Sequence, residues 1–308
     1  MLLTEHFARP PAWGIWILLY FFFAGLAGGA YVIATMVRLR GGRSSRVAHT
    51  GYLLAFWSLL VCPIFLTVDL GQPLRFWHMM VNTTPGGVGL NLNTATPMSL
   101  GVWALLIFGF FSLVSFLAEL GADWARPARS LLGGALGTAF AVVGSLFGLF
   151  VAGYTGVLLS VSNQPVWSDT PALGGLFLAS GMSGAAAAIG LLAGRTARTG
   201  ETDVEGLDRA DAYFAALELV LLVVFFLSVA IAGSLGTALR LPWTLLWLVA
   251  IASLAFPLRG LRRDDLRLQA GPGAPAGAGA LRASATLTAA VVLIGVLALR
   301  AAVIFSAQ

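Results

Sequence analysis

Long apolar runs dominate this chain, and their lengths predict helices that cross a membrane. A helix needs about 20 apolar residues to span roughly 30 Å of hydrocarbon, and runs of that order recur along the sequence. They lie at residues 13–37, 48–69, 98–120, 130–160, 172–194, 210–235, 241–258 and 281–305. The seventh is short and is bounded by Pro242 and Pro257. The pattern predicts an all-α integral membrane protein with about eight transmembrane helices.

The predicted helices divide into two four-helix bundles, one in residues 1–165 and one in residues 166–308. Pairs of glycines four residues apart place small residues on one helix face, where they let two backbones approach closely. These pairs are Gly25 with Gly29, Gly133 with Gly137, and Gly144 with Gly148. They favour close packing of the first and fourth predicted helices.

Composition agrees with the hydropathy pattern, because 58% of residues are hydrophobic and only 10% are charged. Such values are typical of a protein with several membrane spans. The net charge of +5 comes from arginine, since the chain has no lysine. In a membrane protein a basic balance reflects orientation in lipid, so we expect no nucleic-acid partner.

The distribution of arginine predicts the orientation of the helices. Most arginines fall in the connections that follow the odd-numbered helices. The opposite face has Arg9, Arg75 and Arg240, with Arg300 near the outer end of the last helix. By the positive-inside rule, both termini lie on the outer, periplasmic side of the inner (cytoplasmic) membrane. The first span follows a 12-residue tail without a basic region, which is untypical of a cleaved signal peptide.

Histidine and cysteine are too scarce for a resident redox centre. A haem in a helix bundle usually needs histidine ligands, and an iron–sulfur cluster typically needs four thiolates. The chain has three histidines, His6, His49 and His78, outside or at the margins of the apolar runs, and one cysteine, Cys62. We therefore expect neither haem nor an iron–sulfur cluster in this chain. If it transfers electrons, they must pass through an exchangeable molecule such as a quinone.

Polar residues gather toward the outer side of the first four helices. With a rise of 1.5 Å per residue, Tyr20 and Tyr154 lie about 10 Å below the outer surface. Asp69 closes the second helix on that side, and Asn91 and Asn93 precede the third. The connecting loop, residues 71–96, is long and rich in Trp, Asn, Thr, Pro and Gly. Loops of that length are usually functional or disordered, and the aromatic residues favour a docking surface or a lid.

Each candidate site residue also has a plainer interpretation. Tyr20 could belong to an aromatic belt at the membrane surface. Asp69 could be a helix-end carboxylate paired with Arg75, and His78 a surface or docking histidine. Glu218 lies inside the sixth helix, where an ionisable group suggests a proton path, but it could pair with an arginine or a hydroxyl of a neighbouring helix. Glu119 and Asp211 are expected to be charges at the inner membrane boundary.

Four segments in order resemble the membrane-subunit family of polysulfide reductase, the NrfD/PsrC type. They are LYFFFAGLAGGA at residues 19–30, DLGQPLRFWH at residues 69–78, PMSLGVW at residues 97–103 and YTGVLLSVSNQPVW at residues 154–167. The second half of the chain resembles the family in hydropathy and helix count.

The resemblance implies a haem-free subunit that binds quinone, either menaquinone or ubiquinone, in the first helix bundle near the outer face. It also implies two partners: an iron–sulfur subunit of the four-cluster ferredoxin type and a catalytic subunit, typically a molybdopterin oxidoreductase. By motif, Tyr154 matches the tyrosine that binds the quinone headgroup, and Asp69 matches an acidic site residue. Tyr20 stands where some members have histidine, and Ile17 where an amide can occur.

The expected mechanism joins these residues. The headgroup carbonyls of the quinone would meet Tyr154 and Tyr20. Asp69 would relay protons, since desolvation favours its protonated form while Arg75 opposes this. Two other functions stay open. One is a structural anchor without its own quinone site. The other is a proton- or ion-translocating module, which needs polar groups near the midplane, whereas those found here are shallow.

Overall fold

A computed structural model describes residues 11–40, 45–83, 87, 89–93, 96–196, 202–270 and 278–308. His6, Arg9 and Thr94 lie outside these ranges. The long helices of the described chain are α1 (Ile15–Leu39), α2 (Arg46–Asp69), α3 (Pro97–Glu119), α5 (Gly134–Ser160), α6 (Leu173–Thr196), α7 (Thr202–Ala232), α9 (Trp243–Ala270) and α10 (Ala278–Ser306). The short elements are η1 (Pro73–Met79), η2 (Asp123–Ala125), α4 (Arg126–Leu131), α8 (Leu235–Ala238), β1 (Val81–Asn82) and β2 (Gly89–Leu90).

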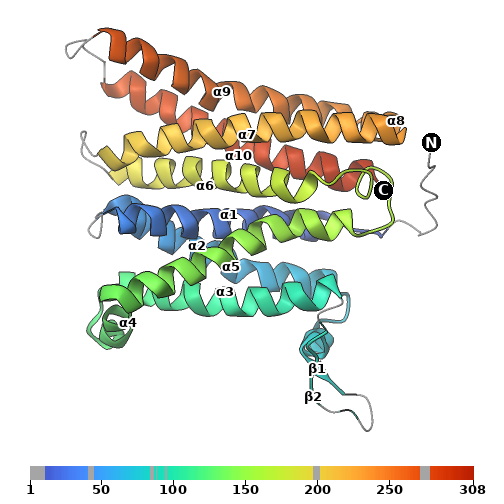
Figure 1. The fold of residues 1–308 in the computed structure, drawn as a ribbon, viewed down its shortest axis with the longest axis horizontal. Helices are drawn as coiled ribbons and strands as arrows, with labels where there is room; N and C mark the ends of the chain where they lie inside the picture. The colour runs from blue at the N-terminus through green and yellow to red at the C-terminus, as the bar shows by residue number, and fades with distance from the viewer. Residues whose placement is uncertain are drawn as a thin grey trace.

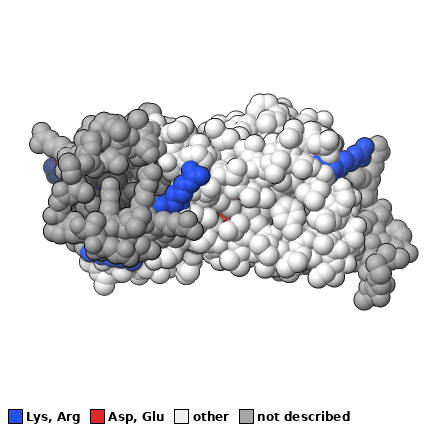
Figure 2. Space-filling model, turned by 90° about the horizontal axis from the view of Figure 1, so that it is seen from above, with Lys and Arg blue, Asp and Glu red and all other residues white. Residues whose placement is uncertain are grey.

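The prediction of an all-α integral membrane protein is confirmed. Within the described ranges, seven helices are long and apolar enough to cross a membrane. The apolar part of α9, Trp243–Arg259, is shorter than the others, so the count of eight is not reached by length alone. Figure 2 shows a face whose middle is almost free of charged groups, as expected for a surface in contact with lipid.

Two predicted helix boundaries are wrong. Pro257 does not end α9, because it lies inside a helix that continues to Ala270. The run at residues 130–160 is also interrupted, since α4 ends at Leu131 and α5 begins at Gly134, whose φ is +59°. A positive φ is readily adopted by glycine, which has no Cβ. The break therefore separates α4 from the membrane-spanning α5.

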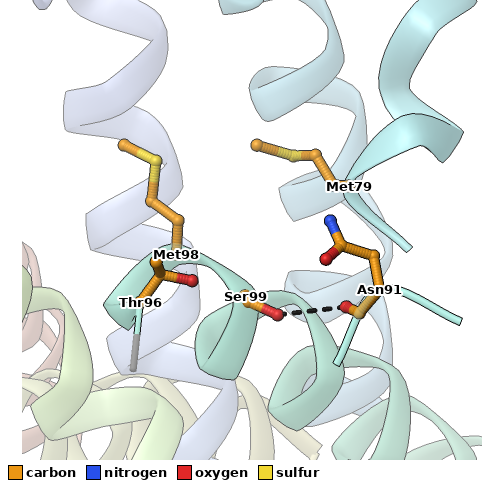
Figure 3. Close-up of a pocket in the computed structure, with 5 residues that line it drawn as sticks. All are labelled: Met79, Asn91, Thr96, Met98 and Ser99. Carbon is orange, nitrogen blue, oxygen red and sulfur yellow. Dashed lines mark hydrogen bonds between the residues drawn. The ribbon is translucent and has the colours of Figure 1, made fainter. Parts of the chain in front are cut away.

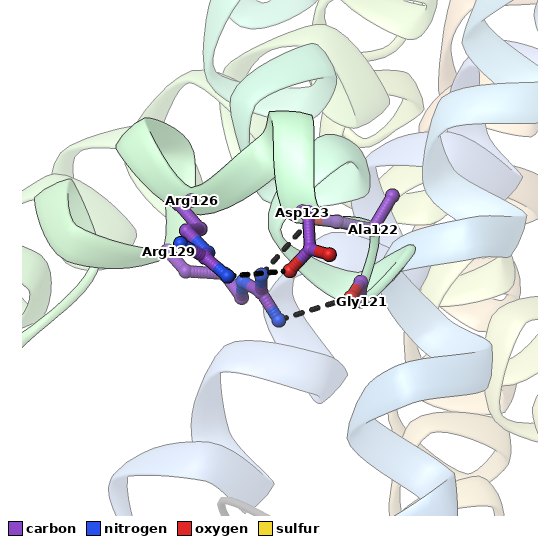
Figure 4. A network of polar contacts seen from close by, with 5 residues as sticks. All are labelled: Gly121, Ala122, Asp123, Arg126 and Arg129. Carbon is purple, nitrogen blue, oxygen red and sulfur yellow. Dashed lines mark hydrogen bonds and ion pairs between the residues drawn. The ribbon is translucent and has the colours of Figure 1, made fainter.

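A polar network orders the connection between α3 and α5 (Figure 4). Arg126 pairs with Asp123 at 2.9 Å, and both side chains are mostly exposed. Arg129 donates to the main-chain carbonyls of Gly121 at 3.1 Å and Ala122 at 2.9 Å. An exposed pair of this kind contributes little stability, so its role is to shape the loop.

Helix α1 is central and packs against α2, α5, α6 and α10 (Figure 1). Its glycines make these contacts close. A Cβ on Gly28 would lie 2.2 Å from the carbonyl oxygen of Gly148 on α5, and one on Gly29 would lie 2.7 Å from that of Gly181 on α6. Close packing of the first and fourth predicted spans is therefore confirmed. Since α1 also contacts helices from both halves of the sequence, the division into two four-helix bundles stays a prediction.

The end of the molecule where α1 begins and α10 ends is called here the outer end, and the opposite end the inner end. The Nε2 amide of Gln308 donates to the main-chain carbonyl of Trp13 at 3.1 Å, and Trp13 stacks on Trp167 with ring centroids 5.2 Å apart. The two ends of the described chain therefore lie together at this end.

The loop between α2 and α3 contains η1 and a short two-stranded hairpin. After η1, the strands β1 and β2 pair antiparallel with Val81 opposite Leu90. The hairpin projects sideways from the bundle at the outer end of α3 (Figure 1). It is anchored at Asn91, whose main-chain carbonyl accepts from Ser99 Oγ at 3.2 Å and from Trp103 Nε1 at 3.1 Å.

Candidate functional site

Tyr154 joins α5 to the first turn of α3. It lies six residues before the end of α5, about 9 Å below the outer end. Its hydroxyl donates a short hydrogen bond to the main-chain carbonyl of Pro97, the first residue of α3. The side chain is only 8% exposed. The packing of α5 on α3 therefore sets the position of the hydroxyl.

Gly101 makes room for the Tyr154 ring, and sequence reasoning did not single it out. A Cβ at Gly101 would lie 2.5 Å from Cε1 and Cζ of Tyr154. On its other side the ring stacks on Phe150, one turn earlier in α5, at 5.5 Å between centroids. Any larger residue at position 101 would displace the tyrosine. The sequence feature that could have pointed to this role is the presence of Gly101 in the PMSLGVW segment.

A pocket of about 140 Å³ lies at the outer end of α3. It is lined by Met79, Asn91, Thr96, Met98 and Ser99 (Figure 3). Two of these residues flank Pro97, whose carbonyl holds Tyr154. An apolar cavity of about 150 Å³ can hold a benzene ring, so this pocket has room for a single six-membered ring next to side-chain hydroxyl and amide groups.

Tyr20 lies in the same part of the bundle, on α1. It is 3% exposed and is close enough to Tyr154 and Cys62 for electrostatic interaction with both. The Cys62 thiol donates to the main-chain carbonyl of Ser58 at 3.3 Å. Burial on this scale places Tyr20 inside the bundle, so the aromatic-belt interpretation does not fit it. The two predicted tyrosines therefore lie in the same part of the bundle.

Asp69, Arg75 and His78 lie nearer the surface. Asp69 is the last residue of α2 and is partly exposed, whereas Arg75 in η1 is exposed. Among the described residues no ion pair joins Asp69 to Arg75. His78 stacks on Trp77 at 4.0 Å, and its Nδ1 is 3.3 Å from the main-chain carbonyl oxygen of Arg75. The structure thus gives Asp69 and His78 no shared contact, and their roles stay predictions.

Three further charged residues, Glu119, Asp211 and Arg300, show how burial differs from the sequence-based expectation. Glu119 pairs with His49 at 3.0 Å, as a boundary charge should. Asp211 lies two residues inside the apolar part of α7 and is buried rather than exposed, with 6% exposure and a hydrogen bond accepted from Ser183 Oγ at 2.5 Å. Arg300 lies near the outer end of α10, as expected, but its side chain is fully buried within the bundle. Its isolation within an apolar run was the signal that sequence reasoning missed.

Metal ligation is not supported by the side chains that are placed. Over the described ranges, no group of three or more His, Cys, Asp or Glu residues is arranged to hold a metal ion. The residues that line the outer-end pocket offer amide and hydroxyl groups for hydrogen bonding.

Comparison with known proteins identifies the family. Residues 3–308 match the family described as polysulphide reductase, NrfD. The chain belongs to the NrfD polysulphide reductase family. It is 30% identical over 236 residues to a component of the polysulfide reductase of Wolinella succinogenes, covering 68% of each protein. Protein NrfD of Escherichia coli is 28% identical over 241 residues, covering 73% of this chain and 74% of that protein.

A shorter match links the chain to another reductase. A subunit of the selenate reductase of Mesobacillus selenatarsenatis is 36% identical over 78 residues, which is 25% of this chain and 18% of that protein. The names of the polysulfide and selenate relatives describe parts of reductase complexes. The family resemblance seen in the sequence is thus confirmed, and the chain is a multi-pass membrane protein of this family.

Proposed function

We propose that this NrfD-family chain is a haem-free, quinone-binding membrane subunit that exchanges electrons between the membrane quinone pool and an iron–sulfur partner at the outer end. The observation that carries the proposal is the arrangement of Tyr154, Pro97 and the adjoining pocket. The Tyr154 hydroxyl donates to the main-chain carbonyl of Pro97. The residues on either side of Pro97 in the chain, Thr96 and Met98, line a pocket of about 140 Å³. Bound quinone supplies the two-electron carrier, and the chain supplies the groups that orient it.

Tyr154 has to change its hydrogen bond when it donates to a quinone carbonyl. Its single hydroxyl proton points to Pro97, and one proton serves one strong hydrogen bond at a time. Binding therefore transfers this donation from the Pro97 carbonyl to the ligand. We propose that Tyr20, which is buried on α1 and interacts electrostatically with Tyr154, supplies a second contact to the headgroup.

Protons have to accompany the electrons, and Asp69 is the proposed relay. It is a partly exposed carboxylate at the outer end of α2, so it can exchange protons with water while staying near the first helices. Arg75 and His78 in η1 then act by setting the charge around this route rather than by direct pairing with Asp69.

The proposed partners follow from the names of the relatives and from the shape of the outer end. The polysulfide reductase and selenate reductase relatives are each named as one part of a larger reductase. The η1–β1–β2 region exposes Leu74, Phe76 and Leu90 beyond the bundle. We propose that a four-cluster ferredoxin-like protein binds here and links the chain to a molybdopterin subunit. Purification of the chain under mild conditions should then bring with it a cysteine-rich, iron-containing protein.

We propose that the protein lies in the inner membrane, with its outer end facing the periplasm. Both ends of the described chain meet at the outer end, which requires an even number of crossings. With α9 counted as a crossing beside the seven longer helices, this condition is met.

The direct test is a titration of the purified chain with a quinone analogue, followed by tryptophan fluorescence. Trp103 is a suitable reporter because its indole is bonded at Asn91, beside the pocket. We expect saturable quenching in the wild type and an affinity about fivefold to tenfold weaker in Tyr154→Phe, the effect of one lost hydrogen bond. Tyr213→Phe is the matched control, since Tyr213 is 66% exposed on α7.

A structural anchor is the rival function, and one observation favours it: the Tyr154 hydroxyl already has a partner in Pro97. An anchor would show no saturable quenching in a sample that is folded and bound to its partner. Equal affinities for the wild type and Tyr154→Phe would show that the Tyr154 hydroxyl does not contribute to quinone binding, even if quinone binds elsewhere on the protein.

A further inference from the structure

A second set of buried polar groups lies between α1, α6, α7 and α10, apart from the outer-end pocket. Its cation is Arg300 of α10, which is fully buried. Its Nε donates to the carbonyl of Phe21 on α1 at 3.2 Å, and its Nη2 to that of Phe177 on α6 at 3.1 Å. Its Nη1 donates to Ser180 Oγ at 2.8 Å and to the Val296 carbonyl at 3.3 Å.

The guanidinium of Arg300 is therefore surrounded by neutral acceptors. It also lies over the ring of Phe177, 5.1 Å from the centroid. A Cβ on Gly25 would lie 2.5 Å from Nη2, so the glycine of α1 leaves the space that the guanidinium fills. Among the described residues, no carboxylate contacts Arg300 within ion-pair distance. The positive charge stays uncompensated at short range.

The second member of the set reaches toward the inner end. Asp211 is two residues inside the apolar part of α7, Arg209–Ala232, and accepts from Ser183 Oγ at 2.5 Å. Ser183 follows Ser180 by three residues, so both hydroxyls lie on nearly the same face of α6. One hydroxyl contacts the arginine and the other contacts the aspartate.

Glu218 is the unexplained member. It lies seven residues after Asp211, which is two turns and about 10 Å farther along the same face of α7. It is 2% exposed, and its Oε2 has no hydrogen-bond partner within the described part of the chain. It interacts electrostatically with Arg300 and Asp211. A buried carboxylate oxygen without a hydrogen-bond partner is costly when the group is charged, and ionisable groups at membrane depth usually serve function.

We propose that Asp211, Ser183 and Glu218 form a proton path that opens at the inner end and stops at Glu218, and that Arg300 closes it toward the outer end. A fixed arginine charge is an effective barrier to protons in a pore. A proton taken up from water at Asp211 converts the Glu218 carboxylate to the acid, and it leaves by the same route. No other bond changes.

The distance between the two carboxylates sets one requirement. About 10 Å along α7 exceeds a single hydrogen bond, so water has to bridge part of the path beyond the Ser183 hydroxyl. Among the described side chains, the charged groups that interact electrostatically with Glu218 are Arg300 from α10 and Asp211 from its own helix. The described side chains of α6 that join this set are the hydroxyls of Ser180 and Ser183.

This path does not depend on the proposed quinone site, so either can fail alone. Glu218 lies nine residues inside the apolar segment Arg209–Ala232, as expected from its place in the sixth predicted helix, and is therefore deeper than the polar groups of the outer end. The path ends inside the bundle, and this makes it a proton-storage branch rather than a complete channel across the membrane.

The test is infrared difference spectroscopy of the full chain reconstituted in liposomes in one orientation, with pH changed on one side at a time. We expect an acid carbonyl band that is lost in Glu218→Gln and retained in Asp123→Asn, a control at an exposed carboxylate of the inner end. The band should change when the pH is changed on the side of the inner end. It should not change on the same timescale when the pH is changed on the side of the outer end. A band that survives in Glu218→Gln would overturn the proposal.

A second variant keeps the test valid if Glu218→Gln does not fold. Ser183→Ala leaves both carboxylates in place and removes only the hydroxyl that contacts Asp211. We expect the inner-end response of the band to slow by about fivefold or more. An unchanged rate, or equally fast responses from both ends, would contradict a path that runs through Ser183 and is closed by Arg300.

Discussion

At the scale of single residues, the outer end is organised around side chains that bond to the main chain. Tyr154 bonds to Pro97, and Ser99 and Trp103 bond to Asn91. Main-chain acceptors do not vary with the side chain at their position, so these contacts hold the site in place whatever residue supplies the carbonyl. The chemistry of the site then depends on the few donors that can exchange partners.

Sequence reasoning found Tyr20 and Tyr154 because depth follows from the fixed rise of a helix. It could not find the Pro97 contact, because that depends on how α5 packs against α3. Arg300 was missed for a related reason. Its acceptors are carbonyls of Phe21 and Phe177, and a carbonyl gives no signal in the sequence.

Asp69→Asn tests the proton relay at this scale. The amide keeps the size of the side chain but cannot take up a proton, so we expect quinol-linked turnover of the assembled complex to fall about tenfold or more. Quinone-analogue affinity should change little, because the structure gives Asp69 no contact with the pocket residues. Steady-state kinetics and the fluorescence titration measure the two quantities separately.

The control for this experiment is Asp123→Asn, which removes an exposed carboxylate at the opposite end. Turnover equal to that of the wild type in Asp69→Asn would show that protons use another group, and a matching loss in Asp123→Asn would show that the effect is not specific.

At the scale of elements, hydropathy predicted the long helices well and their ends less well. The extension of α9 beyond Pro257 was missed because its last residues are charged and proline usually interrupts a helix. The hairpin of β1 and β2 was missed because two-residue strands carry no periodicity that a sequence pattern can reveal.

The contact between α1 and α5 predicts a strong effect of a small substitution. In Gly28→Ala the added methyl group meets the Gly148 carbonyl at 2.2 Å, so one of the two backbones has to move. Overpacking of this kind costs about 1–3 kcal/mol. Thermal unfolding in detergent should therefore show a lower midpoint for this variant.

Gly109→Ala on α3 is the matched control, since a Cβ there meets nothing within 4 Å. Alanine is also the better helix former, so its midpoint should stay equal or rise. A midpoint for Gly28→Ala equal to that of Gly109→Ala would mean that α1 and α5 pack less closely than described.

At the scale of the whole molecule, the proposed orientation can be tested through the protein's own chemistry. Cys62 is fully buried, so it should not react with a membrane-impermeant maleimide. Cysteines introduced at Gln72, near the outer end, and at Asp123, near the inner end, then report sidedness. In intact spheroplasts we expect labelling of Gln72→Cys and none of Asp123→Cys.

Labelling of Asp123→Cys alone would reverse the orientation that arginine distribution predicts. Labelling of both variants after the membrane is opened is the control that both positions are accessible. The hydropathy and charge pattern predicted this topology, whereas the convergence of α1 on both halves of the sequence could be seen only in the packing.

The guanidinium of Arg300 has a further consequence for biosynthesis. Phe21 and Arg300 are separated by 279 positions, and α10 leaves the ribosome after α1 to α9. Until α10 inserts, the Arg300 side chain does not fill the space beside Gly25. The charged guanidinium therefore has to enter the lipid before the carbonyl and hydroxyl acceptors surround it. Insertion of α10 is therefore expected to be the late, committing step of assembly. A nascent chain halted before it should be a target for membrane proteases even with all earlier helices in place.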